Sequence, residues 1–273
     1  MQSSANNSHK QLRVVQFTDT HFFEAPTGRL MGVDTSLTFR EVKALALEQR
    51  GTPDFYLLTG DLSQDETEGS YRRFSEALED LGAPAFYLPG NHDRRAAMHK
   101  AFSESKAPIK RDRVFPLSNW VVVLLDTLVE NEVHGHLEDA ELAHLEESLA
   151  QHQDKHALVC MHHHPLPMGA QWLDEIGVDN ADRFLEIIDG HKNVRCVLWG
   201  HVHQQFETER NGVHYLATPS TCVQFKPLSE SFAADEVPPG YRWLELNSDG
   251  KVSSGVERLA KVAAGLDMSS GGY

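Results

Sequence analysis

Five short apolar runs of this chain each end just before side chains that commonly bind metal ions. The clearest run lies within residues 54–61 and ends in Gly60 and Asp61. The other four runs end in the same way. Residues 14–17 precede Asp19 and His21, and residues 85–88 precede Asn91, His92 and Asp93. Residues 157–161 precede His162, and residues 196–199 precede His201 and His203. Short apolar runs are typical of buried strands. We therefore expect five strand ends to converge on one place, with Asp61 at its centre.

The side chains at these strand ends predict a pair of metal ions. In D-x-H and H-x-H segments the outer residues point to the same side of an extended chain, so each pair can reach one site. Imidazole nitrogen and carboxylate oxygen, without thiolate, suit Mn, Fe, Zn or Co and exclude a dedicated calcium site. Seven candidate ligands are too many for one ion but suit two ions that share a carboxylate. Such a pair is typical of phosphoester hydrolysis.

The apolar pattern predicts strands that alternate with helices. Strands are expected at 13–18, 54–61, 85–88, 157–161 and 194–199. Helices are expected at 37–50, 66–81, 137–151 and around 181–188. Asp34, Thr35 and Ser36 are candidate caps of the first helix, Gly51 is its stop, and Gly82 is expected to end the second helix in a left-handed conformation. We further expect a helix and loop at 94–113, a hairpin of 114–117 with 120–125, and an antiparallel ending made of 212–217 and 241–246.

The chain is expected to form one domain over residues 1–273, because it contains neither a repeat of solenoid period nor a low-complexity linker. Residues 1–11 and 264–273 are polar or rich in serine and glycine, and we expect flexible tails there. Residues 218–240 are predicted to form a long loop, which is a feature of functional or mobile segments.

Charge and hydropathy restrict the partners. The net charge of −15 argues against nucleic acid and anionic membranes, because phosphate backbones are bound by clustered Lys and Arg. No run approaches the roughly 18 apolar residues of a membrane span, and residues 1–10 lack a signal-peptide core, so we expect a cytoplasmic protein. Cys160, Cys196 and Cys222 are widely spaced and are interpreted as small buried hydrophobic residues. The oligomeric state cannot be predicted.

Taken together, the motifs resemble the signature of the calcineurin-like metallophosphoesterases over roughly residues 13–205. They are Asp19-x-His21, Gly60-Asp61, Gly90-Asn91-His92-Asp93, His162-His163 and Gly200-His201-x-His203. The resemblance implies an α/β fold, a four-layer αββα sandwich. It also implies that Asp19, His21, Asp61 and His203 hold one ion, that Asp61, Asn91, His162 and His201 hold the other, and that Asp61 bridges them.

Within that superfamily the chain is most similar to the bacterial class III 3′,5′-cyclic nucleotide phosphodiesterases of the cyclic AMP type. The further resemblance lies in segments 162–167, 171–174, 200–205 and 218–225. It implies that two divalent ions, Fe²⁺ or Mn²⁺ foremost and Zn²⁺ or Co²⁺ as alternatives, hold a bridging hydroxide that opens cyclic AMP to 5′-AMP. The alternatives are a phosphodiesterase for glycerophosphodiesters or other phosphodiesters, and a scaffold without turnover. A nuclease is disfavoured because the chain lacks a basic stripe.

Several residues near the motifs have more than one interpretation. His92 is expected to assist the leaving oxygen or stabilise charge on phosphorus, the alternative being a structural histidine. Trp172 either stacks on a nucleobase or packs within its loop. Asp93 either orients His92 or caps a helix, and Arg94 and Arg95 either steer phosphate or lie on a solvated helix face. His164 is expected behind the ligands or exposed. The expected catalytic residues are His92 and Asp61, and the expected substrate contacts are His21, Asp61, Asn91, His92, His163 and His203.

Overall fold

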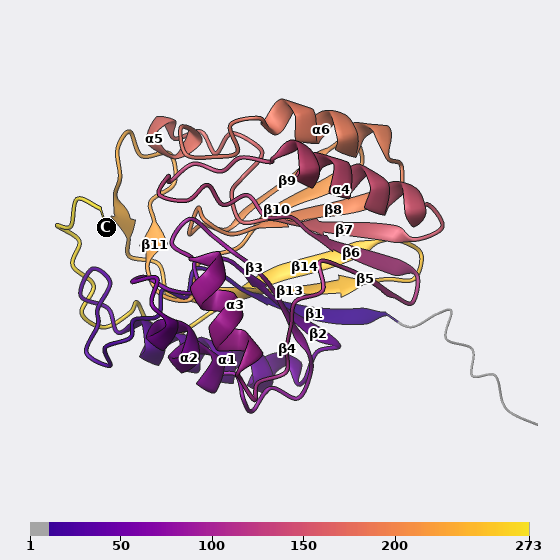
Figure 1. Cartoon of the computed structure of the whole chain (residues 1–273). Coiled ribbons are helices and arrows are strands. Elements are labelled where there is room, and N and C mark those ends of the chain that lie inside the picture. The colour runs from indigo at the N-terminus through magenta and orange to yellow at the C-terminus, as the bar shows by residue number, and fades with distance from the viewer. Residues whose placement is uncertain (1–10, 273) are drawn as a thin grey trace, which may run out of the picture.

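Two six-stranded sheets lie face to face in the computed structural model, which describes residues 11–272 (Figure 1). The first sheet has the strand order β14-β13-β1-β2-β3-β4. Its strands are β1 (Leu12–Phe17), β2 (Phe55–Thr59), β3 (Ala85–Leu88), β4 (Ile109–Lys110), β13 (Gly240–Leu246) and β14 (Val252–Arg258). β1, β2, β3 and β4 run parallel, whereas β13 is antiparallel to β1 and to β14.

The second sheet has the order β5-β6-β7-β8-β10-β9. Its strands are β5 (Val114–Leu117), β6 (Trp120–Leu124), β7 (His156–Cys160), β8 (Val194–Trp199), β9 (Phe206–Arg210) and β10 (Val213–Ala217). β6, β7, β8 and β10 are parallel, while β5 and β9 form antiparallel edges. The predicted hairpin is thus confirmed as β5 and β6.

Helices cover the outer face of each sheet, which confirms the four-layer sandwich (Figure 1). α1 (Thr35–Arg50), α2 (Glu68–Glu76) and α3 (Arg95–Ser103) pack on the first sheet. α4 (Asp139–Gln151) and α6 (Ala181–Gly190) pack on the second, and the short helix α5 (Gln171–Asp174) lies in a loop. A third core, between the sheets, contains Leu57, Trp120 and Leu158. Because both faces of β2 are covered, all five of its residues are buried.

Some predicted details differ. Residues 212–217 and 241–246 do not form one antiparallel ending, because β10 and β13 lie in different sheets. α2 ends at Glu76 and continues only as turns, and Gly82 does not adopt a left-handed conformation. By contrast, Asp34 caps α1 as predicted by accepting a hydrogen bond from the Leu37 amide, and Gly51 has φ of 62°.

The loop and tail segments make defined contacts at the left end of Figure 1, where the parallel strands have their carboxyl ends. The predicted loop 218–240 contains a two-stranded ribbon of β11 (Gln224–Phe225) and β12 (Ala234–Asp235). In the predicted C-terminal tail, the amide of Asp267 donates to the carbonyl of Met31. Residues 1–10 of the predicted N-terminal tail lie outside the described part.

Candidate metal centre

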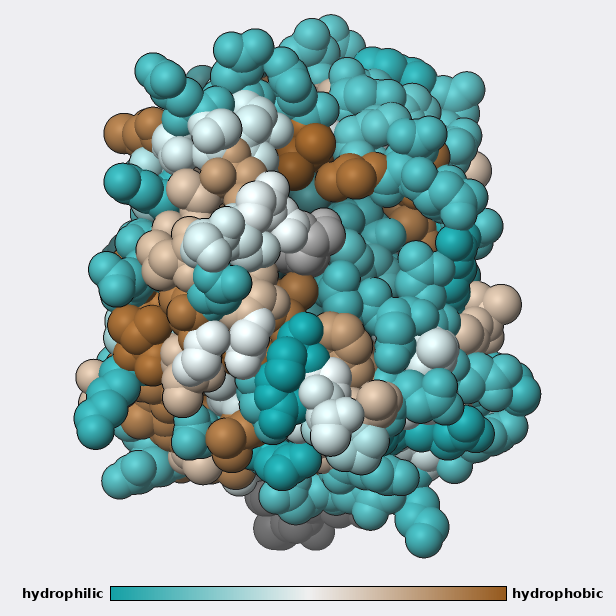
Figure 2. All heavy atoms as spheres, turned by 90° about the vertical axis from the view of Figure 1, so that its left-hand side faces the viewer, coloured by the Kyte–Doolittle hydropathy of each residue, from teal (hydrophilic) through white to brown (hydrophobic). Residues whose placement is uncertain are grey.

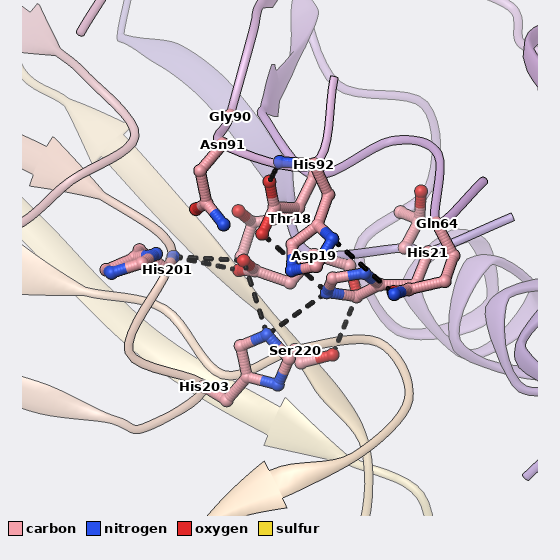
Figure 3. A network of polar contacts seen from close by, with 12 residues as sticks. Thr18, Asp19, His21, Gln64, Gly90, Asn91, His92, His201, His203 and Ser220 are labelled. Atoms are coloured by element: carbon pink, nitrogen blue, oxygen red, sulfur yellow. Dashed lines mark hydrogen bonds and ion pairs between the residues drawn. The ribbon is translucent and has the colours of Figure 1, made fainter. Parts of the chain in front are cut away.

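The carboxyl ends of the parallel strands from both sheets deliver the predicted ligands to one cluster. Asp19 and His21 follow β1, Asp61 follows β2, and Asn91 follows β3. His162 follows β7 of the other sheet, and His201 and His203 follow β8. In Figure 3, dashed lines join the carboxylate of Asp19 to the backbone nitrogen of His201 and to the imidazole of His203. Predicted ligands separated by up to 184 positions in the sequence are therefore brought together by strand direction.

Five of the seven predicted ligands have left-handed backbone conformations. Their φ angles are 53° for Asp19, 46° for His21, 50° for Asp61, 65° for His201 and 48° for His203. Non-glycine residues rarely adopt this region, and they do so at a cost that neighbouring structure must hold in place. Sharp turns at the strand ends aim these side chains at the cluster, which is a pattern typical of functional sites.

The first group of donor atoms comprises Asp19, His21 and His203. The Nε2 atom of His203 lies 3.4 Å from Oδ1 of Asp19 and 3.3 Å from Nε2 of His21. One donor atom from each of the three residues lies within 4.8 Å of the others. All three side chains are buried. This spacing could hold one ion.

The second group surrounds His162. Its Nε2 atom lies 3.2 Å from Oδ1 of Asn91, and its ring lies 5.1 Å from that of His201. The Nε2 atom of His201 is buried and has no hydrogen-bond partner among residues 11–272. An unpaired buried nitrogen is costly unless a ligand satisfies it. The group therefore fits a metal ion.

Asp61 lies between the two groups. Its Oδ2 atom is 3.3 Å from Nε2 of His162 and 3.8 Å from Nε2 of His21. Its other oxygen, Oδ1, accepts a hydrogen bond of 2.9 Å from the backbone amide of His92. The carboxylate is therefore positioned to contact an ion in either group.

Backbone carbonyls set the tautomers of two histidines that are predicted ligands. Nδ1 of His162 donates to the carbonyl of Thr59 at 2.8 Å, and Nδ1 of His203 donates to the carbonyl of Val223 at the same distance. Each bond leaves Nε2 as the nitrogen that faces the cluster. Partners of this kind orient metal-binding imidazoles.

Burial and neighbouring charges shift the pKa values of the cluster in opposite directions. Burial raises the pKa of Asp61, but His162, His92 and His21 outweigh it and hold the pKa below its usual value. Burial lowers the pKa of His162, but Asp61 and Asp19 reverse this effect and bring the pKa to about 9. Burial and the surrounding histidines lower the pKa of His201. The carboxylates thus create a field that favours a cation beside His162.

His92 and Asn91 are half-buried and reach the surface. Both line a cavity of about 150 Å³ that Asp61 and His201 also line. The Nδ1 atom of His92 lies 3.4 Å from Nε2 of Gln64, and its ring lies 5.2 Å from that of His21. His92 therefore stands beside the cluster and faces the space where a substrate can enter.

Asp93 has neither of its predicted roles. Its carboxylate accepts hydrogen bonds from the amides of Leu62, Ser63 and Gly90 and from the hydroxyl of Tyr71. Residue 94 is the cap of α3, with no side-chain hydrogen bond. The buried Asp93 side chain thus joins the loop after β2 to the loop after β3 and fixes both Asp61 and Asn91 from behind.

The arginines that follow are held in ion pairs. Arg94 pairs with Glu66 and Glu130. Arg95 forms a two-point pair with Asp126, with hydrogen bonds of 2.7 and 2.8 Å. Both side chains are partly exposed, and their charges are matched by carboxylates, which weakens an attraction for phosphate.

His163 and His164 follow the predicted ligand His162 and are buried. His163 is fully buried; its Nε2 atom donates to the carbonyl of Val133, and Nδ1 lies 2.7 Å from the hydroxyl of Thr127. His164 is only 3% exposed, and its ring stacks 5.7 Å from that of His201. An exposed position for His164 is thus wrong. His163 lies within ligand distance of His162 and His201, but both its nitrogens are already engaged.

The aromatic lining of the cavity could be predicted only in part from the sequence. Trp172 lines the cavity as one of its predicted roles requires, but Phe225 and Phe232 line it as well. These two residues occupy the predicted loop 218–240, where isolated aromatic residues carry no periodic signal. Their place beside the predicted metal ligands follows from the fold of the segment that contains β11 and β12.

Comparisons with known proteins agree with the fold and the cluster. The model of the calcineurin-like phosphoesterase family matches residues 12–205. The chain is 38% identical to the 3′,5′-cyclic adenosine monophosphate phosphodiesterase CpdA of Pseudomonas aeruginosa, over 95% of this chain and 94% of that one. It is 39% identical to the CpdA of Escherichia coli K12, over 96% and 95% of the two chains.

A solved structure shares the fold at low sequence identity. A dimetal phosphatase from Danio rerio superposes with a TM-score of 0.64 at 14% identity, covering 90% of this chain and 98% of that one. Within residues 11–272, none of the helices has the length and apolar character needed to cross a membrane. The family match over residues 12–205 and the 38% and 39% identity to the two CpdA proteins over nearly the whole chain show that the chain belongs to the calcineurin-like phosphoesterase family.

Proposed function

We propose that this protein hydrolyses 3′,5′-cyclic AMP to 5′-AMP at a centre of two divalent ions. The observation that carries the proposal is the position of Asp61 between two groups of histidine and carboxylate donors. The names and full-length similarity of the CpdA relatives support the substrate. A soluble small molecule is also the kind of substrate that a cavity of about 150 Å³ suits.

The two groups of donors assign the ligands. We propose that Asp19, His21, Asp61 and His203 bind one ion, and that Asp61, Asn91, His162 and His201 bind the other. Nitrogen and oxygen donors without thiolate favour Fe²⁺ or Mn²⁺, with Zn²⁺ or Co²⁺ as alternatives. When bound, such a pair supplies a hydroxide at neutral pH and offsets the charge on the phosphoryl oxygens.

The remaining side chains have positioning and proton-transfer roles. Asp61 sets the separation of the two groups, and its Oδ1 atom holds the backbone of His92. The imidazole of His92 faces the cavity, where it can donate a proton to the leaving 3′-oxygen or a hydrogen bond to the phosphoryl group. His21, Asn91 and His203 are the other proposed contacts near the phosphate. His163 is better suited to supporting His162 than to touching the substrate, since it is fully buried.

A substrate panel tests the proposal. Metal-reconstituted protein is assayed against cyclic AMP, cyclic GMP, a glycerophosphodiester and an aryl phosphodiester, and the products are identified. We expect cyclic AMP to yield 5′-AMP with a kcat/KM well above that of the aryl diester. Brisk cleavage of the aryl diester or glycerophosphodiester without cleavage of cyclic AMP would refute the substrate. No turnover of any diester would instead favour the scaffold without activity. A cytoplasmic location stays a prediction.

A further inference from the structure

The cavity at the candidate metal centre is lined by two chemically different sets of side chains. The polar set is Asp61, Asn91, His92 and His201, which supply carboxylate, amide and imidazole groups. The apolar set comes from separate segments and is made of Val133, Trp172, Ile176, Phe225 and Phe232. Among these five side chains, only the indole of Trp172 carries a hydrogen-bonding group. On the face of the molecule at this end, hydrophobic residues gather left of centre among scattered hydrophilic ones, whereas the right-hand part is mostly hydrophilic (Figure 2).

Three aromatic rings of the apolar set contact one another. The ring of Phe225 lies 5.7 Å from that of Trp172 at 66° and 5.1 Å from that of Phe232 at 69°. The rings of Trp172 and Phe232 are 5.5 Å apart at 73°. Edge-to-face contacts of this kind are favourable and fix the ring orientations. The three rings, which we call the aromatic wall, are thus held as a unit.

The aromatic wall is joined directly to a predicted metal ligand. The ring of Phe225 stacks on the imidazole of His203, with centroids 4.0 Å apart and planes within 4°. Phe225 is only 5% exposed, whereas Trp172 and Phe232 are partly exposed. Phe225 therefore anchors the wall to the centre, and Trp172 and Phe232 present aromatic surface to the cavity.

We infer that Trp172 and Phe232, braced by Phe225, bind the nucleobase of the cyclic nucleotide by stacking. This inference rests on the proposed function and extends it to the part of the substrate away from the phosphate. A cyclic nucleotide has a charged phosphate at one end and a flat base at the other, which matches the polar and the apolar set of lining side chains. Aromatic rings accept any base through its face. The wall therefore selects for a flat base and favours cyclic nucleotides over phosphodiesters that lack one.

The decisive experiment compares two substrates that differ only in the base. Trp172→Ala is assayed on cyclic AMP and on methyl riboside 3′,5′-cyclic phosphate, which keeps the ring and phosphate. We expect kcat/KM for cyclic AMP to fall roughly 5- to 150-fold, mainly through KM, since loss of one base stack has that effect. Turnover of the base-free diester should remain within about twofold of the wild-type value. Phe232→Leu should act in the same direction, and Trp172→Phe should restore most of the activity.

Binding of the product gives a readout that does not depend on turnover. Titration of 5′-AMP should quench the fluorescence of Trp172, and the quenching should disappear in Trp172→Phe while ribose 5-phosphate causes none. Trp243→Ala is the matched control, because Trp243 lies against Arg50 away from the cavity. It should leave the ratio of the two substrates unchanged.

The outcomes separate this inference from the proposed function. If Trp172→Ala slows both diesters equally, or if 5′-AMP leaves tryptophan fluorescence unchanged, the base subsite is wrong while cyclic AMP hydrolysis stands. If the wild-type enzyme cleaves the base-free diester and not cyclic AMP, the proposed function fails and the base subsite fails with it.

Discussion

The Oδ2 atom of Asp61 lies 3.3 Å from Nε2 of His162 in the direction of one donor group and 3.8 Å from Nε2 of His21 in the direction of the other. His201 belongs to only one group, where its ring lies 5.1 Å from that of His162. The two residues therefore differ in how many ions their loss should affect.

Asp61→Ala is expected to bind neither ion tightly, whereas His201→Ala should retain one. Removal of Asp61 takes a ligand from both groups and leaves buried histidines without their counter-charge. Calorimetric titration with Mn²⁺ and elemental analysis of the washed protein measure the stoichiometry. Two ions bound to Asp61→Ala at wild-type affinity would contradict a bridging position.

His92→Ala is expected to bind two ions and to lose roughly 10²- to 10⁴-fold in kcat, the usual range for a general acid. The backbone amide of residue 92 remains available to Asp61 in this variant, so the metal centre should be preserved. Single-turnover rates on cyclic AMP, together with metal content, test both parts. Full turnover by the variant would make His92 a structural histidine.

Asp93→Ala should lower the free energy of unfolding by at least about 3 kcal/mol, because it leaves three buried amides and the Tyr71 hydroxyl without their acceptor. Chemical denaturation measures the change. Asp112→Ala is the matched control: Asp112 is exposed, and its loss should change stability by no more than about 0.5 kcal/mol. Similar values for the two variants would rule out a role for Asp93 in joining the two loops.

Much of this architecture could be predicted from the sequence because buried strands carry a local signal. The apolar residues 55–59 and 85–88 are covered on both faces, and polar ligands directly follow them. Strands β9 and β14 were missed because they lie at sheet edges and contain mainly partly or fully exposed polar residues, as in Phe206–Arg210. An edge strand of this kind has no alternation that distinguishes it from a loop.

The predicted ligands meet in space, yet the contacts that hold them could not be predicted. D-x-H, G-N-H-D and G-H-x-H are local patterns, and strand direction suffices to bring them together. The partners of Asp93 and the pairing of Arg95 with Asp126 depend instead on which loops become neighbours after folding. For the same reason, Phe225 and Phe232 gave no signal of a substrate subsite before the ribbon of β11 and β12 was known.

Metal binding by the metal-free protein should release a proton from His162. The pKa of His162 is raised to about 9 by Asp61 and Asp19 despite burial. At pH 7.5 the imidazole is therefore a cation with both nitrogens protonated, and a bound ion must displace one of these two protons. His201 has a lowered pKa and is already neutral at that pH. Titration with Mn²⁺ in weak buffer should therefore release about one proton from His162 at pH 7.5 and progressively less as pH passes 9. Equal release at pH 7.5 and pH 10 would contradict the raised pKa.

Gly90→Ala is expected to disturb the metal centre without altering any ligand. A Cβ atom at position 90 would overlap Oδ1 and the backbone nitrogen of Asp61 and would lie 2.7 Å from Cε1 of His162. Because Asp61 and His162 are buried, they can move only by giving up their positions beside the donor groups. We expect metal affinity or activity to fall roughly 10- to 100-fold, as when supporting contacts of a metal site are lost. Gly190→Ala is the matched control, since a Cβ atom there meets nothing within 4 Å at the end of α6. Wild-type metal affinity in Gly90→Ala would show that the centre tolerates displacement of Asp61, and the close approach of the two loops would then have no role in metal binding.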